Sequence, residues 1–381
     1  TLAAILLSVY LLSDGLDLMG LDRTMAMSFG LSVERFTVLA LIAGSAIVAI
    51  AVSLGGVVGF IGLIAPHIAR WQVGARHKYV LPASAVIGAA LVMFSDALSR
   101  SLLPPGENTA RADHRLYRRP FLYLSAGETG EKIMITVNNL NVCKQDKTIL
   151  TVDSLHLPAR GSIALIGPNG SGKSTLIKAL SGLDREVFSA VTLDGKNISR
   201  YKGAARMQKI GLIPQSFNPC WDQRTEELIS LAAERAADPK AAKASACRKY
   251  ELQPLLDKHW HILSGGEKSR VLTAMALMCD PPVIFADEPG AALDIKHRMQ
   301  LIEDLTAQGK EKLVVVCLHE LDMVFRYFES VIVLSQGQLR YFGSSAALLE
   351  SSLLNEVFDV EFRKIEMDGY STVYAHTIIR P

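Results

Sequence analysis

A glycine-rich run near the middle of the chain has the residue types that phosphate binding needs. Residues 167–174 read GPNGSGKS and fit the pattern G-x-x-x-x-G-K-[ST]. They stand between a strand predicted at residues 163–166 and a helix predicted to open at Thr175, which is the setting that this pattern requires. Glycines let the backbone wrap around the anion so that N–H groups and the helix start point at it. The residues expected to bind nucleotide here are Gly167, Pro168, Asn169, Gly170, Ser171, Gly172, Lys173, Ser174 and Thr175.

Three side chains at the end of this run have distinct expected roles. Lys173 is expected to reach the β- and γ-phosphates, and Ser174 to give its hydroxyl to Mg²⁺. Thr175 is expected to hydrogen-bond beside the α-phosphate. A phosphate loop alone would also suit a GTPase, a kinase or a recombinase, so the residues at a distance from it must decide the class.

A second anion-binding run decides which class of phosphate-loop protein this is. Residues 263–267 read LSGGE and precede a helix predicted at residues 268–279. Ser264 and the backbone N–H groups of Gly265 and Gly266, at a helix start, can grip a γ-phosphate. The run resembles the signature of the ATP-binding cassette superfamily, in which it acts on ATP bound to the opposite copy of the domain. The resemblance therefore implies that two copies sandwich two nucleotides.

Two carboxylates follow a hydrophobic strand predicted at residues 283–286, which places Asp287 and Glu288 at the phosphate end of the sheet. In the resembled family, Asp287 corresponds to the position that holds Mg²⁺ through water. Glu288 corresponds to the residue that polarises the attacking water. Gln215 matches a glutamine that reaches Mg²⁺ and senses the membrane partner, and His319 matches a histidine that contacts the γ-phosphate in the closed dimer. The resemblance thus implies Glu288, His319 and Lys173 as catalytic residues and Ser174, Gln215 and Asp287 as the metal site.

Two positions depart from the resembled pattern. Lys144 stands where an aromatic ring usually stacks on adenine, so the base is expected to be stacked more weakly or by another side chain. Residues 290–294 read GAALD, where the family commonly has a serine-containing turn before Leu-Asp. Asp294 is retained, and we expect the contact across the dimer to differ in detail.

The alternation of short apolar runs with amphipathic stretches predicts an α/β domain over residues 134–381. Further strands are predicted at residues 313–318 and 331–334, and a tight hairpin turn at Asp194 and Gly195. Residues 226–258 are rich in helix formers and predict a helical subdomain. The fold class predicted is an α/β phosphate-loop NTPase of the cassette type, preceded by an all-α transmembrane permease fragment.

The charge, the cysteine content and the hydrophobic fraction limit the classes of partner and the cell compartment to expect. The formal net charge of the 381 residues is +2, which gives no support for a surface that binds nucleic acid, and none is expected as a partner. The 5 cysteines include no C-x-x-C pair and no neighbouring histidine cluster, so reduced cytosolic thiols are expected rather than a metal or disulfide framework. The hydrophobic fraction of 49% is high for a soluble protein, and its excess lies in the first hundred or so residues.

Residues 36–54 carry no charge and are long enough to cross a bilayer core as a helix. Residues 80–98 predict a second span, and residues 1–12 are apolar but short, as the end of a truncated span would be. The connection between the two main spans closes on Arg70, Arg76 and Lys78, which places it on the cytoplasmic side, with an ordinary loop as the alternative.

This first part resembles the C-terminal part of permeases of the bacterial iron–siderophore, haem and cobalamin importers. The resemblance is carried by MSFGL at residues 27–31, GFIGLIAPHIAR at residues 59–70 and LPAS at residues 81–84. It implies that residues 66–77 include a short helix that docks beside the glutamine loop of the ATPase. Arg70, Arg76 and Lys78 are then candidate contacts, with lipid head groups as the alternative.

The resemblance stops after residues 104–107, where an arginine-rich sequence that would be costly to bury in a membrane replaces one more apolar helix. We therefore expect three segments: a partial permease at residues 1–110, a charged linker at residues 111–133, and the ATP-binding domain at residues 134–381. The chain looks as if it begins within a longer protein, because residue 1 lies in an apolar run without a signal sequence. A change of reading frame between neighbouring genes is the hypothesis that accounts for both observations.

The function predicted from these residues is ATP hydrolysis that drives uptake of a metal chelate, with ferric siderophore ahead of haem or cobalamin. The expected cofactors are ATP and Mg²⁺. The expected partners are a second ATPase copy, membrane permease subunits and an extracytoplasmic substrate-binding protein, at the bacterial cytoplasmic membrane with the ATPase on its cytoplasmic face. Three alternatives stay open: an exporter half-transporter, a soluble cassette ATPase of DNA repair or translation, and a non-functional relic.

Overall fold

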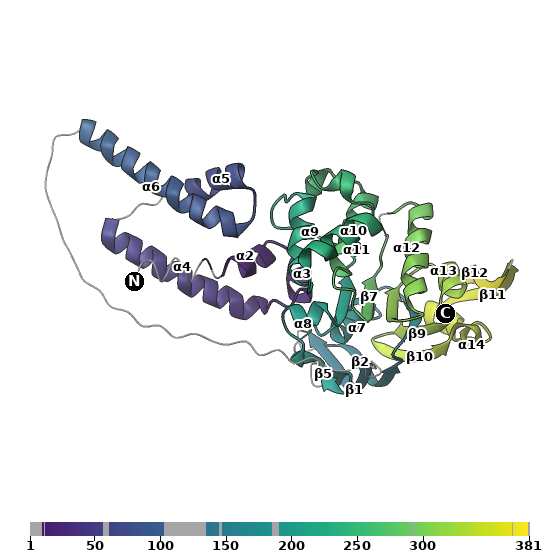
Figure 1. The fold of residues 1–381 in the computed structure, drawn as a ribbon. Helices are drawn as coiled ribbons and strands as arrows, with labels where there is room; N and C mark the ends of the chain where they lie inside the picture. The colour runs from purple at the N-terminus through teal and green to yellow at the C-terminus, as the bar shows by residue number, and fades with distance from the viewer. Residues whose placement is uncertain are drawn as a thin grey trace. The chain divides into compact units, whose positions relative to one another are not determined.

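The computed structural model describes residues 10, 12–55, 61–102, 135–144, 147–184, 190–291, 293–367 and 369–379, with the backbone alone at residues 52–55, 95–102 and 144. It divides into two compact units (Figure 1). Unit 1 comprises Thr1–Arg23, Leu31–Thr129 and Pro219–Gln223, and unit 2 comprises Thr24–Gly30, Gly130–Asn218 and Arg224–Pro381. The expected linker at residues 111–133, Met134 and most of residues 1–12 lie outside the described residues.

Unit 1 is helical. Its two long helices contain the two spans predicted from composition, because α4 (Val33–Gly55) includes residues 36–54 and α6 (His77–Leu102) includes residues 80–98. The connection between them forms α5 (Ile61–Val73), with Pro66 inside it, so the alternative of an ordinary loop is wrong. The remaining helices near the start of the chain are α2 (Ser13–Met19) and α3 (Arg23–Ser28), the second of which lies mostly in unit 2.

The long helices of unit 1 present apolar side chains to the outside. On α4, Val38 and Leu41 are 57% and 64% exposed, and on α6, Val86 and Phe94 are 70% and 68% exposed. Two described segments, Val33–Ala51 and His77–Phe94, are long and apolar enough to cross a membrane. A helix of the core of a soluble protein would bury such residues, so these surfaces suit lipid or neighbouring transmembrane helices.

Small residues let α5 and α6 pack closely. Ala65 and Ala69 on α5 are buried, and a Cβ added at Gly88 on α6 would lie 3.7 Å from the Cβ of Ala65. This is the packing expected where apolar surroundings give no hydrophobic drive and close contact must hold the helices together. A buried pair ties α2 to the start of α6, because the backbone N–H of His77 and its Nδ1 each lie 2.7 Å from Asp17 Oδ1.

Unit 2 is built on one large mixed sheet. The described strands follow the order β5-β4-β1-β2-β10-β9-β3-β8-β7-β6. Strands β9, β3, β8, β7 and β6 run parallel to one another, whereas β1, β2, β4 and β5 pair antiparallel. The strand bounds are β1 (Ile135–Lys144), β2 (Lys147–Leu157), β3 (Gly161–Ile166), β4 (Val191–Leu193), β5 (Lys196–Asn197), β6 (Ile210–Ile213), β7 (Val283–Asp287), β8 (Leu313–Cys317), β9 (Ser330–Ser335) and β10 (Gln338–Ser344).

The parallel strands form the core of unit 2. Every residue of β6, β7 and β8 is buried, as expected for parallel strands covered on both faces. The strands predicted at residues 163–166, 283–286, 313–318 and 331–334 are confirmed as β3, β7, β8 and β9, with ends that differ by at most two residues. The predicted hairpin turn joins β4 to β5, and its two residues Asp194 and Gly195 have φ of 52° and 68°, the left-handed values that a two-residue turn requires.

Helices surround the sheet, and α9, α10 and α11 form the helical subdomain (Figure 1). The prediction of helix over residues 226–258 is confirmed for α9 and α10, and α11 is the helix expected after the second anion-binding run. The helix bounds are α7 (Lys173–Leu180), α8 (Ala204–Met207), α9 (Thr225–Ala233), α10 (Pro239–Lys249), α11 (Gly265–Ala276), α12 (Ile295–Gln308), α13 (Leu321–Tyr327), α14 (Ser345–Leu349) and α15 (Leu353–Phe358), with short 3₁₀ turns at Ile198–Arg200, Gln253–Leu255 and Trp260–Ile262.

The chain closes with a two-stranded antiparallel sheet that the sequence did not predict. Strands β11 (Val360–Met367) and β12 (Tyr370–Ile378) pair with each other, and β12 packs beside α13 (Figure 1). The guanidinium of Arg326 on α13 lies over the ring of Tyr370, 5.5 Å from its centroid. Apolar residues of β11 stand at positions 360, 362, 365 and 367, so the alternation slips by one position in mid-strand and gives no single period.

Candidate functional site

The ends of four neighbouring parallel strands assemble the site. The phosphate loop follows β3, His319 follows β8, Asp287 ends β7 and Glu288 follows it, and Gln215 follows β6. These strands lie in the order β3-β8-β7-β6, so their carboxyl ends share one edge of the sheet. Ligands of open parallel sheets bind at that edge. The topology therefore brings the predicted catalytic and metal-binding residues of this chain to one place, whereas the predicted phosphate-gripping residues Ser264, Gly265 and Gly266 lie elsewhere.

The phosphate loop has the backbone that its glycines were expected to allow. Gly167, Gly170 and Gly172 have φ of 153°, 77° and 100°, all in the region that favours glycine. A Cβ at Gly167 would lie 2.1 Å from the carbonyl oxygen of Leu334, so no larger residue fits there. A Cβ at Gly170 would meet open space, which shows that this part of the loop faces outward.

Lys173 lies folded onto the loop. Its Nζ donates to the carbonyl oxygens of Gly167, at 2.8 Å, and Pro168, at 3.0 Å, and the residue is 6% exposed. Gly172 caps the start of α7 without a side-chain hydrogen bond, so the first N–H groups of the helix are left for an anion. The ammonium group and the helix start together form a phosphate site, and an arriving phosphate would compete with the two carbonyl oxygens for Lys173.

Glu288 is held by the two residues predicted to work with it. Gln215 Nε2 donates to Glu288 Oε2 at 2.7 Å, and His319 Nε2 lies 2.6 Å from Glu288 Oε1. Glu288 has φ of 49°, a left-handed conformation that costs a non-glycine residue roughly 1–2 kcal/mol. Such strain is typical of functional positions. Here it turns the carboxylate out of the strand toward both partners.

Asp287 has the properties of a cation ligand. It is 6% exposed, and its Oδ1 is buried without a hydrogen-bond partner among the described residues. Burial raises the pKa of this carboxyl group, while a hydrogen bond from Ser174 lowers it. A buried carboxylate oxygen without a partner is costly unless a cation or water satisfies it. Asp287 with the hydroxyl of Ser174 therefore fits Mg²⁺, which prefers oxygen ligands.

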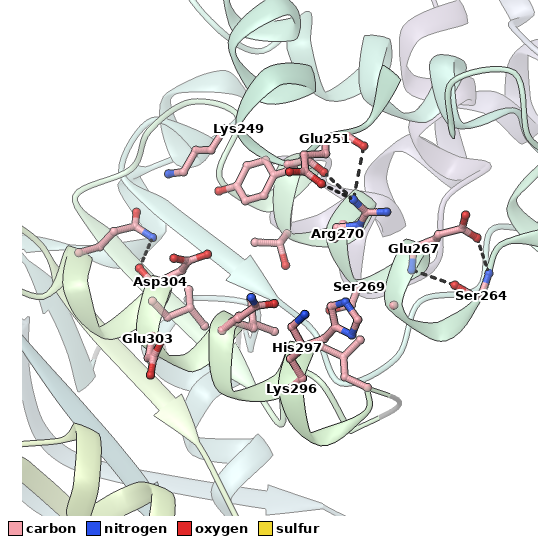
Figure 2. A pocket seen from close by; sticks show the side chains of 18 residues that line it. Lys249, Glu251, Ser264, Glu267, Ser269, Arg270, Lys296, His297, Glu303 and Asp304 are labelled. Carbon is pink, nitrogen blue, oxygen red and sulfur yellow. Dashed lines mark hydrogen bonds and ion pairs between the residues drawn. The ribbon is translucent and has the colours of Figure 1, made fainter. Parts of the chain in front are cut away.

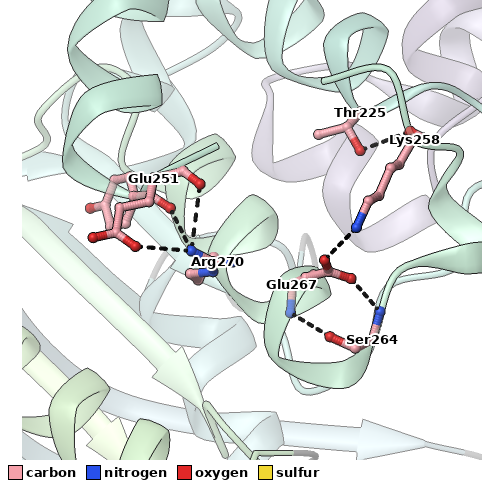
Figure 3. Close-up of polar contacts among 7 residues, drawn as sticks. Thr225, Glu251, Lys258, Ser264, Glu267 and Arg270 are labelled. Carbon is pink, nitrogen blue, oxygen red and sulfur yellow. Dashed lines mark hydrogen bonds and ion pairs between the residues drawn. The ribbon is translucent and has the colours of Figure 1, made fainter. Parts of the chain in front are cut away.

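The second anion-binding run starts helix α11, as predicted. Ser264 Oγ accepts from the N–H of Glu267 at 3.3 Å, and Glu267 Oε2 accepts from the N–H of Ser264 at 2.8 Å, which is a capping box (Figure 3). Ser264 is exposed, and the cap leaves its O–H able to donate to a phosphate. The run is therefore presented as an outward-facing anion site.

The structure separates this run from the phosphate loop. Ser264 and Gly266 line a cleft of about 880 Å³ together with residues of α10 and α12 (Figure 2). No residue of the phosphate loop lines that cleft. This cleft therefore belongs to the second anion site alone, as expected if that site serves a nucleotide on another copy of the chain.

An ion pair supports the capping box, and its removal should cost stability. Lys258 Nζ lies 2.7 Å from Glu267 Oε1 (Figure 3), and this hydrogen bond is the largest cause of the lowered pKa of Glu267. We expect Glu267→Gln to lower the free energy of unfolding by roughly 0.5–1 kcal/mol at pH 7, since the pair is partly exposed. Chemical denaturation of the full chain in detergent measures this change.

The pH dependence and a control separate the ion pair from a general loss of charge. Because the folded-state pKa of Glu267 is lowered, its stabilisation is present above the unfolded pKa and disappears as pH falls through the folded pKa. The gap between wild type and Glu267→Gln should therefore close in acid. Glu251→Gln is the control, since the carboxylate of Glu251 is 83% exposed and lies 3.4 Å from Arg270 Nη1. An equal loss in both variants would contradict the assignment.

One segment of unit 2 was missed in the sequence, although it lies in the permease-like part. Unit 2 includes Thr24–Gly30, where Met25, Ala26 and Phe29 are 0%, 1% and 2% exposed. The N–H of Gly203 donates to the carbonyl oxygen of Gly30 at 3.3 Å. This segment is therefore packed into the compact unit that carries the phosphate loop. In the sequence, the MSFGL string at residues 27–31 indicates only a resemblance to permeases. It does not indicate that this segment packs against the ATP-binding domain.

Unit 1 in turn includes Pro219–Gln223, which follows Gln215 in the sequence. The guanidinium of Arg70 lies over the ring of Trp221, 4.7 Å from its centroid, and the N–H of Cys220 donates to the carbonyl oxygen of Gly20 at 2.7 Å. Arg70 is one of the three contacts expected from the sequence. Lys78, another of them, is exposed. The permease-like residues and the segment after the glutamine are thus combined in unit 1.

The fold and the strand-end site define a phosphate-loop ATPase of the cassette type. Comparison with known proteins agrees: the FecCD transport family matches residues 1–112, and the ABC transporter family matches residues 150–291. A hemin import ATP-binding protein of Chelativorans sp. (strain BNC1) is 32% identical over 243 residues, which are 60% of this chain and 93% of that protein. A hemin import ATP-binding protein of Thermobifida fusca (strain YX) is 30% identical over 242 residues, 61% of this chain and 84% of that protein.

Two further comparisons extend the likeness. A petrobactin import ATP-binding protein of Bacillus anthracis is 28% identical over 244 residues, 60% of this chain and 88% of that protein. A solved ATP-binding subunit of an ABC transporter is 23% identical with a TM-score of 0.52, and the match covers 59% of this chain and 98% of that one. The chain belongs to the ABC transporter family. It is an ATP-binding cassette ATPase that carries a FecCD-type permease fragment ahead of the cassette.

Proposed function

We propose that this chain hydrolyses ATP, with Mg²⁺, to drive uptake of a metal chelate. The observation that carries the proposal is the contact of Glu288 with both Gln215 and His319 at the edge of the sheet where the phosphate loop lies. A carboxylate, an imidazole and an amide placed there can orient and deprotonate a water beside a γ-phosphate. Phosphate release from ATP by the purified full chain tests the activity, and its absence would contradict the proposal.

Binding of the triphosphate would begin at the loop. The N–H groups of residues 167–174 and the start of α7 receive the phosphates, and Lys173 leaves the carbonyl oxygens of Gly167 and Pro168 to contact them. Ser174 and Asp287, with Gln215, would hold Mg²⁺, which when bound neutralises charge on the phosphates. Thr175 adds a hydrogen bond near the α-phosphate.

The contact network of Glu288 describes a resting arrangement. Each carboxylate oxygen accepts one contact, Oε2 from Gln215 and Oε1 from His319, which leaves acceptor capacity on both oxygens for water. His319 is exposed and can turn toward a γ-phosphate, which frees Glu288 Oε1 for that water. Glu288 is thus proposed as the general base and His319 as the group that positions the phosphate.

Closure of the site needs a second copy of the chain. Ser264 is exposed, and with Gly266 it lines a cleft that includes no residue of the phosphate loop. We propose that it grips the γ-phosphate of ATP held by a partner cassette, so that two copies enclose two nucleotides. The near-neutral net charge supports a protein partner over nucleic acid.

Two packed segments would pass this closure to the membrane part. One is Thr24–Gly30 in unit 2, and the other is Pro219–Gln223 in unit 1. The first is a permease-like segment that belongs to the unit of the cassette, and the second is a cassette segment that belongs to the unit of the permease-like helices. Movement within either unit would therefore displace residues that belong to the other part of the sequence. Permease subunits and a substrate-binding protein outside the membrane complete the proposed importer, with the cassette on the cytoplasmic face.

A substitution at Gly30 should separate hydrolysis from transport. Gly30 has φ of 87°, and a Cβ there would lie 2.3 Å from the carbonyl oxygen of Gly203. We expect Gly30→Ala to lower uptake more than about tenfold, since strain and overlap together exceed about 1.4 kcal/mol. ATP turnover should remain measurable, because Gly30 lies outside the phosphate loop. Uptake by cells and turnover by purified protein are measured side by side.

Gly44→Ala is the matched control. Gly44 lies on α4, where a Cβ would meet nothing within 4 Å, so this substitution adds the same methyl group without a contact. It should leave uptake unchanged. If Gly30→Ala also leaves uptake unchanged, residues 24–30 do not transmit the motion of the cassette.

Ferric siderophore is the proposed cargo, and haem is the second candidate. The relative that imports petrobactin supports the first, and the two relatives that import hemin support the second. Uptake of labelled ferric siderophore and of haem, by cells with and without the gene, decides between them. Loss of haem uptake alone would reassign the cargo.

We also propose that residues 1–110, 111–133 and 134–381 are a permease fragment, a linker and a cassette. The two family matches support this division, since they end at residue 112 and resume at residue 150. Sequencing of the DNA across codons 100 to 135 and a blot for the full-length protein test whether a reading-frame change created the junction. An intact frame with one full-length product would contradict that origin.

A further inference from the structure

A cysteine that ATP hydrolysis does not require lies inside the catalytic site. Cys317 is the last residue of β8, and its side chain is 0% exposed. Strand β8 pairs parallel with β7 so that Cys317 stands directly opposite Asp287. Adjacent strands of a sheet are about 4.8 Å apart, so this register sets a thiol against a carboxylate.

Three ligand atoms converge there. The Sγ of Cys317 and one carboxylate oxygen each of Asp287 and Glu288 all lie within 4.8 Å of one another. His319 Nε2 lies 2.6 Å from Glu288 Oε1, which adds a nitrogen at the edge of the group. A single cation could contact all three atoms after side-chain movements of an ångström or two, because metal–sulfur and metal–oxygen bonds are about 2.0–2.3 Å long.

The cluster adjoins a small cavity and contains an unsatisfied oxygen. Cys317, Glu288 and His319, together with Arg298 and Glu320, line a cavity of about 40 Å³ that Asp287 does not line, whereas one water requires roughly 10–15 Å³. Asp287 is 94% buried, and its Oδ1 has no hydrogen-bond partner among the described residues. The unsatisfied oxygen of Asp287 is an observation independent of the cysteine, and a bound cation would satisfy it.

The donor set does not match Mg²⁺ alone. Mg²⁺ takes oxygen ligands and gains nothing from sulfur, whereas Zn²⁺, Cd²⁺ and Co²⁺ bind thiolate, carboxylate and imidazole together. The same carboxylates that would hold Mg²⁺ with ATP can therefore hold a thiophilic cation with Cys317.

We propose that Cys317, Asp287 and Glu288, completed by His319, bind a thiophilic divalent cation of the Zn²⁺ type in the absence of nucleotide, and that this cation inhibits ATP hydrolysis. The inference rests on the proposed function for the role of the two carboxylates. On binding, a metal–sulfur bond forms and the thiol proton passes to solvent, with no change of oxidation state. Glu288 leaves Gln215 for the cation, and the site cannot accept Mg²⁺ with ATP until the cation departs.

Cobalt spectroscopy tests the site without relying on hydrolysis. Co²⁺ is titrated into the nucleotide-free full chain in Mg²⁺-free buffer, and the sulfur-to-cobalt charge-transfer band is recorded. We expect a band that saturates at one equivalent per chain, is lost in Cys317→Val, and persists in Cys247→Ala, which removes a buried thiol of helix α10. In unaltered protein, Mg²⁺ with a non-hydrolysable ATP analogue should displace the band, which does not depend on any variant folding. Absence of a band, or a band that Cys317→Val keeps, overturns the site.

Inhibition by zinc tests the consequence. Phosphate release by the wild type should fall with added Zn²⁺ and recover with a chelator. Loss of a ligand typically weakens a metal site by 10–100-fold, so half-inhibition of Cys317→Val should need at least about tenfold more Zn²⁺, relative to its own zinc-free rate. Equal sensitivity of both proteins overturns the inhibitory role. If the zinc-free wild type releases no phosphate, the proposed function fails, and the cobalt band still decides the metal site.

Discussion

Replacement of Glu288 by Gln is expected to lower ATP turnover by about 10²–10⁴-fold, which is what loss of a general base costs. A glutamine is nearly the same size and can still hydrogen-bond to Gln215 and His319, which now contact the two carboxylate oxygens at 2.7 and 2.6 Å. It cannot take a proton from water. The variant should therefore bind ATP as tightly as the wild type while releasing almost no phosphate.

Two measurements on the same preparation separate these effects. Equilibrium binding of a fluorescent ATP analogue with Mg²⁺ reports the ground state, and phosphate release under saturating ATP reports turnover. Glu303→Gln is the control, because Glu303 lies on α12 and accepts a hydrogen bond from Tyr327 at 2.9 Å, away from the strand ends. Unchanged turnover in Glu288→Gln would remove this residue from catalysis.

The parts of the site that the sequence predicted are those that follow from strand ends. A buried strand has to stop at a polar residue, so Asp287 and Glu288 after β7 and His319 after β8 could be placed on the sheet edge from the apolar runs alone. The backbone of the phosphate loop could also be predicted from its glycines, since glycine adopts positive φ without strain. The roles came from the family resemblance, because spacing does not tell a base from a metal ligand.

What the sequence did not show depends on contacts between distant residues. Gly30 packs against Gly203, which is far away in the chain. The sequence around either glycine does not indicate this contact. The register that sets Cys317 opposite Asp287 is likewise a property of the paired strands. A cysteine in an apolar run reads as an ordinary core residue until its neighbouring strand is known.

For the helix over Ile61–Val73, the residues alone indicate only a connection, and the short helix expected within residues 66–77 came from the family resemblance. Pro66 lies inside it, and proline lacks the N–H that a helix interior needs, so the stretch reads as a connection. Packing compensates here, because Ala65 and Ala69 are buried and let the neighbouring helix approach closely. Proline is tolerated in helices of membrane proteins for this reason.

Replacement of Lys173 by Ala should impair both binding and turnover, in contrast to Glu288→Gln. The ammonium group of Lys173 is buried and donates to the carbonyl oxygens of Gly167 and Pro168, from which it is positioned to move onto phosphate. Hydrogen bonds of a charged group to phosphate contribute about 1.5–3 kcal/mol, so ATP affinity should fall by roughly 10–100-fold. Turnover should fall further, because the lysine also offsets charge that develops during phosphoryl transfer.

Comparison of nucleotides makes this prediction specific. If Lys173 acts on the β- and γ-phosphates, the affinity lost in Lys173→Ala should be largest for ATP, smaller for ADP and negligible for AMP. Lys178→Ala is the control, since Lys178 lies on the same helix with an exposed side chain, and it should change none of the three affinities. Equal losses for ATP, ADP and AMP would mean that the substitution disturbs the loop itself, because the two carbonyl oxygens lose their donor whichever nucleotide is bound. A loss of affinity that grows with the number of phosphates requires the ammonium group to leave those oxygens and bind the ligand. This movement distinguishes a lysine that binds phosphate from one that only stabilises the loop.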